Sequence, residues 1–147
     1  MKIWTLKQKK APMRINKDYL KRLLEAFLDS NTPSINLEDF QKIGLVEDEH
    51  TFVFHMKILD DQNLIEQMDG DRGFGLTIGA DGSYHWSVLP LRLTARGQDF
   101  AIEFCDQKVW SALKSNFDDI GIEALVSVSK ELFEGILKKG VETLLKP

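Results

Sequence analysis

The sequence predicts a mainly α-helical fold with one small β-hairpin, which is an α+β protein in a single domain. Three observations lead to this prediction. The chain has 147 residues, the usual size of one domain. In several segments, apolar residues recur at the three- and four-residue spacing of amphipathic helices. One central segment instead alternates apolar and polar residues on both sides of a glycine-containing turn, which is typical of a hairpin.

Composition excludes several other classes of protein. With 43% hydrophobic and 29% charged residues, the chain is apolar enough to bury a core, which argues against disorder. No apolar run approaches the roughly 18 residues that span a bilayer, and the start of the sequence lacks the apolar stretch of a signal peptide. The single cysteine, Cys105, excludes an internal disulfide and a cysteine-based metal site. We therefore expect a cytoplasmic protein.

Five helices are predicted, and several of their ends carry capping residues. Asn36, with Asp39 three residues later, forms a capping box, and Thr94 is a second candidate N-cap. Asn63 follows the third helix, where a residue in the left-handed conformation often ends a helix. The predicted helices span, in chain order, residues 17–29, 37–43, 48–62, 95–116 and 122–145.

Short extended segments lie between these helices. A piece over 34–36 precedes the second helix, and a strand over 64–67 follows the third. A hairpin comes next, with alternating arms over 74–78 and 84–88 and a turn over 79–82. Helix, short strand, helix, helix, strand, hairpin and helix is the element order of a winged helix-turn-helix. The expected single domain therefore has an N-terminal arm, a winged-helix core and a C-terminal helix, at residues 1–15, 16–117 and 118–147.

Two motifs resemble a known family. The stretch from His55 to Glu66 resembles the end of the third helix of a winged helix, with Asn63 in place of the usual glycine. The pattern leucine-threonine-x-x-glycine-x-x-phenylalanine over 93–100, with residues 106–110 after it, resembles the entry to the helix that follows the wing. Together they resemble, over roughly residues 17–110, a bacterial and prophage-associated winged-helix family classed as a domain of unknown function. The resemblance implies a fold and brings no catalytic residues.

Charge is distributed unevenly along the chain. The net charge is −4, yet residues 2–22 carry +7 and the remainder carries −11. A basic segment on an acidic body is typical of proteins that bind nucleic acid, although a solvated terminus has the same composition. The candidate nucleic-acid contacts are Lys7, Lys9, Lys10, Arg14, Lys17, Lys21 and Arg22.

The predicted third helix argues against conventional DNA recognition. In a DNA-binding winged helix this helix enters the major groove, where lysine and arginine neutralise phosphates. Between residues 45 and 66, six acidic residues oppose Lys57 alone. The run Glu47, Asp48 and Glu49 stands at the start of the helix, where it repels a phosphate backbone. If DNA binds, we expect the N-terminal basic segment to supply the contacts.

The last predicted helix has a longer apolar stripe than a small three-helix core requires. Mixed charges on its other side argue against a membrane-surface helix. The stripe either docks on the core of its own chain or pairs with a second copy, and the sequence leaves both alternatives open. The candidate dimer interface consists of Leu125, Leu132, Phe133, Ile136, Leu137, Val141 and Leu144.

No set of residues indicates catalysis. His50 and His55 lie on different helix faces, which is not metal-ligand spacing, and His55 is expected in the core. The glycines near the hairpin lack the pattern of a phosphate-binding loop. We therefore expect no enzymatic activity, no cofactor and no metal. The leading hypothesis is a non-enzymatic binding module that acts through protein–protein contacts as a homodimer. The alternative is a prophage-type transcriptional regulator that binds DNA through its N-terminal segment.

Overall fold

The computed structural model of the protein describes residues 12–147, which form a mixed α+β fold. These residues contain six helices and two antiparallel two-stranded sheets, so the predicted α+β class is confirmed. The helices are α2 (Lys17–Leu28), α3 (Leu37–Lys42), α4 (Glu49–Asp61), α5 (Ala95–Cys105), α6 (Gln107–Ser115) and α7 (Ile122–Leu145). The strands are β1 (Ile65–Gln67), β2 (Leu76–Ile78), β3 (Tyr84–Trp86) and β4 (Leu91–Leu93).

The predicted helix caps are confirmed. Asn36 and Asp39 form a reciprocal capping box at the start of α3, with both side chains bonded to backbone amides. The Thr94 hydroxyl accepts a hydrogen bond from the amide of Gly97 and caps α5. Asn63 has a φ of 58°, the left-handed conformation expected after α4. Capping residues act on their own helix end, which explains why the sequence alone predicts them.

The single helix predicted over 95–116 is wrong, because α5 and α6 are separate helices that meet at Asp106. Its ψ of 137° breaks the helical backbone. Its Oδ2 accepts hydrogen bonds from the amides of Lys108 and Val109, at 3.0 and 3.1 Å. Asp106 therefore both ends α5 and caps α6, and aspartate is among the residues preferred at an N-cap.

The extended segments form two separate pairs. The predicted hairpin is confirmed, since β2 pairs with β3 in antiparallel register. The strand β4 was not predicted, because three residues after Pro90 are too short to show a period. It pairs with β1 and also bridges to Ile35 through Leu91. The hairpin β2–β3 therefore lies within the connection between two strands of the other sheet.

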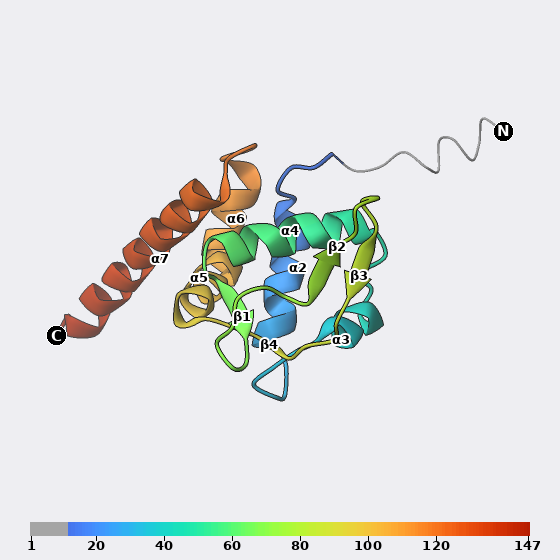
Figure 1. Ribbon diagram of the computed structural model, residues 1–147. Helices are drawn as coiled ribbons and strands as arrows, with labels where there is room; N and C mark the ends of the chain where they lie inside the picture. Colours follow the sequence, from blue (N-terminus) through green and yellow to red (C-terminus); the bar gives the residue numbers. More distant parts are fainter. Residues whose placement is uncertain (1–11) are drawn as a thin grey trace.

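The hydrophobic core surrounds α2, which contributes Leu20, Leu23 and Leu24 to it. Figure 1 shows α4 crossing α2, with the hairpin β2–β3 at the N-terminal end of α4. Helix α7 lies along another side of the molecule and contacts α5 and α6. The largest fully buried side chains from the other elements are Phe40, Leu45, Phe52, Met56, Leu59, Leu64, Ile65, Phe100 and Phe104.

Candidate functional site

The described basic residues among the predicted nucleic-acid contacts have partners within the chain. Arg14 pairs with Asp119 at 2.5 Å, and Lys21 pairs with Glu25 at 2.8 Å. The guanidinium of Arg22 donates to the carbonyl of Ile43 at 3.2 Å. Lys17, the last of the described candidate contacts, donates to backbone carbonyls at the end of α6. The predicted contacts Lys7, Lys9 and Lys10 lie outside the described residues.

Lys17 has a structural function at the C-terminal end of α6. Its Nζ donates to the carbonyl of Leu113 and, at 3.0 Å, to the carbonyl of Asn116. It also lies 3.5 Å from Asp118. The last carbonyls of a helix have no amide partner within that helix and carry a partial negative charge. The ammonium of Lys17 satisfies them, so α2 and α6 are joined by this contact.

The first turn of α4 is connected to the hairpin. The indole N–H of Trp86 donates to Glu49 at 2.8 Å, and the Tyr84 hydroxyl lies 2.7 Å from Nδ1 of His50. Asp48 caps the helix, and its hydrogen bonds with Thr51 hold the pKa of the carboxyl below its usual value. The start of α4 is therefore acidic, and two of its side chains are occupied by the hairpin.

His55 is buried in the core, as predicted. Its Nδ1 donates to the carbonyl of Thr51 at 2.8 Å, and its Nε2 accepts from the amide of Asn16 at 3.0 Å. The ring also packs against Tyr19, with 4.8 Å between ring centroids. This pair of hydrogen bonds requires a neutral imidazole, and burial lowers the pKa of His55. The ring joins α4 to the N-cap of α2.

The predicted dimer interface on α7 consists of two parts that differ in burial. Leu125 is fully buried in the core of its own chain. The side chains of Leu132, Phe133 and Ile136 are partly buried and pack against that core. Beyond this point the helix carries exposed apolar residues, and every residue from 137 onward is exposed. The exposed fractions of Leu137, Val141 and Leu144 are 51%, 53% and 85%.

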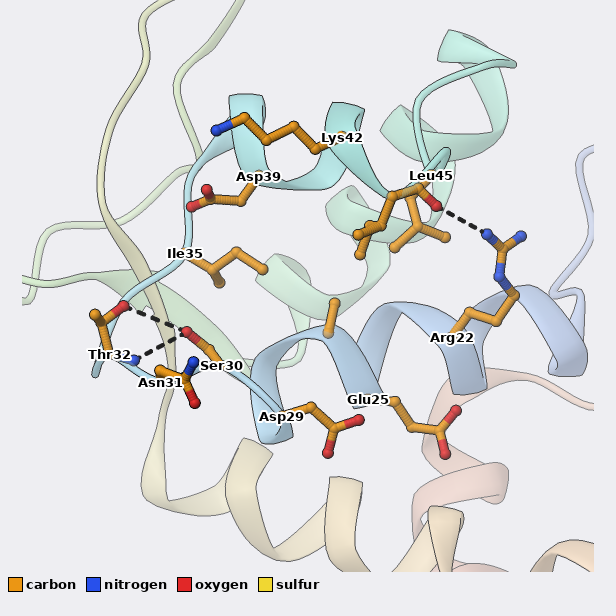
Figure 2. A pocket seen from close by; sticks show the side chains of 12 residues that line it. Arg22, Glu25, Asp29, Ser30, Asn31, Thr32, Ile35, Asp39, Lys42 and Leu45 are labelled. Carbon is orange, nitrogen blue, oxygen red and sulfur yellow. Dashed lines mark hydrogen bonds between the residues drawn. The ribbon is translucent and has the colours of Figure 1, made fainter.

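One pocket, with a volume of about 570 Å³, lies between α2 and α3. Figure 2 shows its mixed lining, in which Glu25, Asp29 and Asp39 lie among apolar side chains such as Ile35. Two of these carboxylates are already engaged. Asp39 belongs to the capping box of α3, and Glu25 pairs with Lys21. The pocket brings together no nucleophile and base in hydrogen-bond contact.

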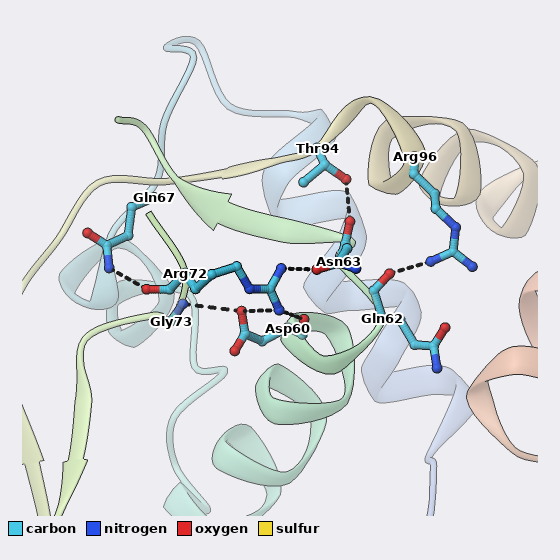
Figure 3. A network of polar contacts seen from close by, with 8 residues as sticks. All are labelled: Asp60, Gln62, Asn63, Gln67, Arg72, Gly73, Thr94 and Arg96. Carbon is cyan, nitrogen blue, oxygen red and sulfur yellow. Dashed lines mark hydrogen bonds and ion pairs between the residues drawn. The ribbon is translucent and has the colours of Figure 1, made fainter. Parts of the chain in front are cut away.

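A polar network fixes the junction between α4, the loop before β2, and α5 (Figure 3). Arg72 donates to the side chain of Asn63 and to the carbonyl of Asp60, and its guanidinium lies 3.3 Å from the Asp60 carboxylate. The hydroxyl of Thr94 donates to the carbonyl of Asn63 at 2.7 Å, and Arg96 donates to the carbonyl of Gln62. These contacts satisfy the last carbonyls of α4, so the network is structural.

Other reactive groups show no arrangement for chemistry. Burial raises the pKa of the Cys105 thiol to about 12, so this thiol is protonated near neutral pH. Within residues 12–147, no cluster of three or more histidine, cysteine, aspartate or glutamate side chains has the geometry to hold a metal ion. In the same part of the chain, no helix has the length and apolar character needed to cross a membrane.

The comparisons with known proteins identify no family for this chain. Family models, curated proteins and solved structures were all compared with it, and none matches. The resemblance to a winged-helix family therefore stays a prediction from the sequence. The contacts of the hairpin with Glu49 and His50 were not foreseen, because no local pattern links residues 34 or 37 positions apart.

Proposed function

We propose that this chain is a winged-helix, non-enzymatic binding module that acts as a homodimer through the C-terminal half of α7. The observation that carries the proposal is the exposed apolar face formed by Leu137, Val141 and Leu144. Exposed apolar residues that form one continuous face, rather than single scattered side chains, mark interaction sites.

The element order supports the winged-helix part of the proposal. A helix, a bridged residue at Ile35 and two further helices precede β1. The strand β4 pairs with β1 on one side and bridges to Ile35, so three extended pieces are side by side. The hairpin β2–β3 is inserted between β1 and β4, in the position of a wing, and α5 follows directly.

The exposed face of α7 is separate from the face that docks on the core. Leu125 and Ser129 are the buried residues of the helix and lie one turn apart. The residues Leu137, Val141 and Leu144 follow one another at spacings of four and three, which places them on a common face. Because that face is rotated from the docked one and extends past it, the contacts within the chain leave it uncovered.

The polar side chains of α7 favour a second copy of the same helix as the occupant. Lys138 and Lys139 precede Glu142 along the helix. Among the described residues, no ion pair involves a side chain of α7. An antiparallel copy paired through Leu137, Val141 and Leu144 would bring Lys139 of one helix close to Glu142 of the other. Such reciprocal contact is the defining property of a two-fold interface. Gly140 leaves the backbone open to close approach.

The test compares two exposed valines. Val141→Glu places a charge in the proposed interface, whereas Val88→Glu places one on a residue of similar exposure outside it, 49% against 53%. Sedimentation equilibrium should give the wild type and Val88→Glu twice the chain mass of 16.8 kDa, and Val141→Glu the chain mass itself. Circular dichroism checks that both variants keep their helix content. A wild type that stays monomeric at submillimolar concentration would refute the proposal.

A further inference from the structure

We infer that the pocket between α2 and α3 binds a zwitterionic small molecule with an apolar body, of the size of a dipeptide. The residues that line this pocket all lie between positions 22 and 45, and none belongs to α7. The inference therefore goes beyond dimerisation and does not depend on whether α7 pairs with a second copy.

The pocket has the size and the apolar surface of a small-molecule site. Its volume of about 570 Å³ lies within the range of roughly 300–1,000 Å³ that is typical of ligand sites. Ile35 and Leu45 line it from the core, with exposed fractions of 6% and 1%, whereas Ile43 is 51% exposed. A bound apolar group would remove the exposed surface of Ile43 from water, which favours binding.

The walls of the pocket are held in place by contacts within the chain. Ser30 Oγ accepts from the amide of Thr32 at 3.2 Å, and the Thr32 hydroxyl donates to the carbonyl of Ser34 at 2.8 Å. Ile35 bridges to Leu91, with both backbone hydrogen bonds at 2.9 Å. The turn after α2 is therefore fixed without a ligand, as in most small-molecule sites.

The end of α2 provides the subsite for an ammonium group. Asp29 is the C-cap of α2 and lines the pocket. The C-terminal end of a helix carries a partial negative charge, which favours a cation and disfavours a carboxylate. The last turn of α2 contains no basic residue, and among residues 12–147 no ion pair involves Asp29. An ammonium group bound here would offset both negative charges.

The α3 side of the pocket provides the subsite for a carboxylate. Lys42 lies in the last turn of α3, and Figure 2 shows it on the α3 wall, across from Asp29 at the end of α2. Within the described part of the chain, no ion pair involves Lys42. Its ammonium group is therefore available to a carboxylate of the ligand.

The charges that line the pocket balance one another. The charged lining residues are Arg22, Lys42, Glu25, Asp29 and Asp39. Lys21, which is not part of the lining, neutralises Glu25 at 2.8 Å, so two charges of each sign remain. Complementarity to such a lining favours a ligand with one charge of each sign over a net cation or a net anion. A molecule with an ammonium group, an apolar body and a carboxylate meets all three parts of the site.

The experiment is an NMR titration of the full ¹⁵N-labelled chain with the dipeptide leucyl-leucine. Three companion ligands have an acetylated amino terminus, an amidated carboxyl terminus, or both. We expect leucyl-leucine to shift the amide signals of residues 29–32 and 42–45. It should bind at least about fivefold more tightly than either singly blocked form, because each blocked form loses one charged contact.

Two pairs of variants test the two subsites. Asp29→Asn should weaken binding of leucyl-leucine about fivefold and leave binding of the acetylated form unchanged. Asp61→Asn also removes an exposed carboxylate at the C-terminal end of a helix, but outside this pocket, and should change neither. Lys42→Gln should weaken binding of leucyl-leucine but not of the amidated form. Lys57→Gln, at an exposed position of α4, is its control.

Several results would overturn the inference. These are no shift at the pocket with about 10 mM dipeptide, a doubly blocked form that binds as tightly as leucyl-leucine, or equal effects of Asp29→Asn and Asp61→Asn. An amidated form that binds more tightly than leucyl-leucine would show that the ligand is a cation. The variant Val141→Glu separates the two proposals, since it should abolish the dimer and leave dipeptide binding unchanged. Loss of dipeptide binding in Val141→Glu would place the ligand at the dimer interface instead.

Discussion

Gly97 is the residue at which one added methyl group meets the backbone of another element. A Cβ at this position would lie 1.8 Å from the carbonyl oxygen of Leu64 and 2.8 Å from its carbon. Neither atom can move without disturbing the start of β1, because the Leu64 carbonyl also accepts from the amide of Thr94 at 3.0 Å. We expect Gly97→Ala to lower the free energy of unfolding by more than about 3 kcal/mol, measured by urea denaturation.

Gly135 supplies the matched control. It also lies inside a helix, but a Cβ added there meets nothing within 4 Å. Because alanine favours the helix over glycine by about 1 kcal/mol, Gly135→Ala should stabilise the protein slightly. Equal effects of the two substitutions would show that the close approach at Gly97 does not exist.

His55 is the residue at which stability depends on pH. Burial lowers its pKa in the folded state, so the unfolded chain binds a proton more readily than the folded chain does. The contribution of His55 to the free energy of unfolding should therefore be complete above the unfolded pKa of about 6.5. It should decrease as the pH falls below that value. Urea denaturation between about pH 7.5 and pH 5 measures this change.

The variant His55→Gln should flatten this pH dependence, whereas His85→Gln, at an exposed position of the hairpin, should leave it as in the wild type. An NMR titration follows the same event directly, since protonation of Nε2 removes the acceptor for the amide of Asn16. If His55 titrates at its ordinary pKa with no change at Asn16, the account of this hydrogen bond is wrong.

At the scale of the elements, Asp106 decides that α5 and α6 are two helices. Loss of its bonds to the amides of Lys108 and Val109 leaves two donors at the start of α6 without a partner in the chain. We expect Asp106→Ala to cost about 1 kcal/mol of stability, and Asp106→Asn to cost less because asparagine is also a good N-cap. Thermal unfolding followed by circular dichroism measures both. Equal losses for the two variants would contradict the capping role.

The two halves of α7 show what periodicity can and cannot predict. The apolar pattern correctly predicted the helix and both of its ends. It did not predict the residue at which α7 ceases to contact the core. The spacing of apolar residues along a helix is the same whether the helix packs against its own chain or against another. The position of α5 and α6 settles this: Leu125 is buried against the core and Val141 is not.

At the scale of the whole molecule, the distribution of charge gives a test of the alternative function. The described basic residues Arg14, Lys17 and Lys21 contact acidic or carbonyl groups of their own chain. In the DNA-binding alternative the N-terminal basic segment supplies the contacts, and its lysines at positions 7, 9 and 10 lie outside the described residues. Under the proposed function, fluorescence titration with random-sequence duplex should show no binding at about 50 mM salt, where phosphate contacts are strong.

A regulator that binds DNA would give the opposite result. Its affinity should fall by orders of magnitude between about 50 and 200 mM salt, as counterions compete for the phosphates. Deletion of residues 1–11 would then abolish binding, whereas the double variant Asp48→Asn, Glu49→Gln would not weaken it. That combination of results would replace the protein-binding proposal by the DNA-binding alternative.

The sequence by itself determined the helices, the hairpin and the helix ends at Asn36, Asn63 and Thr94, with the exception of the boundary at Asp106. These features depend on groups that lie within about four residues of one another along the chain. A short stretch of sequence is therefore enough to predict them. The capping box of Asn36 and the left-handed Asn63 are examples, as both act on the helix to which they belong.

Only the tertiary structure decided which surfaces are left uncovered. The strand β4 exists because β1 and Ile35 supply its hydrogen bonds, and the contacts of Arg14 join residues 105 positions apart. The pocket between α2 and α3 and the exposed face at Val141 likewise result from how several elements pack. Contacts between distant residues produce no recognisable pattern in the sequence. An apolar or charged side chain can pair with any compatible partner, so its identity does not show which partner it has.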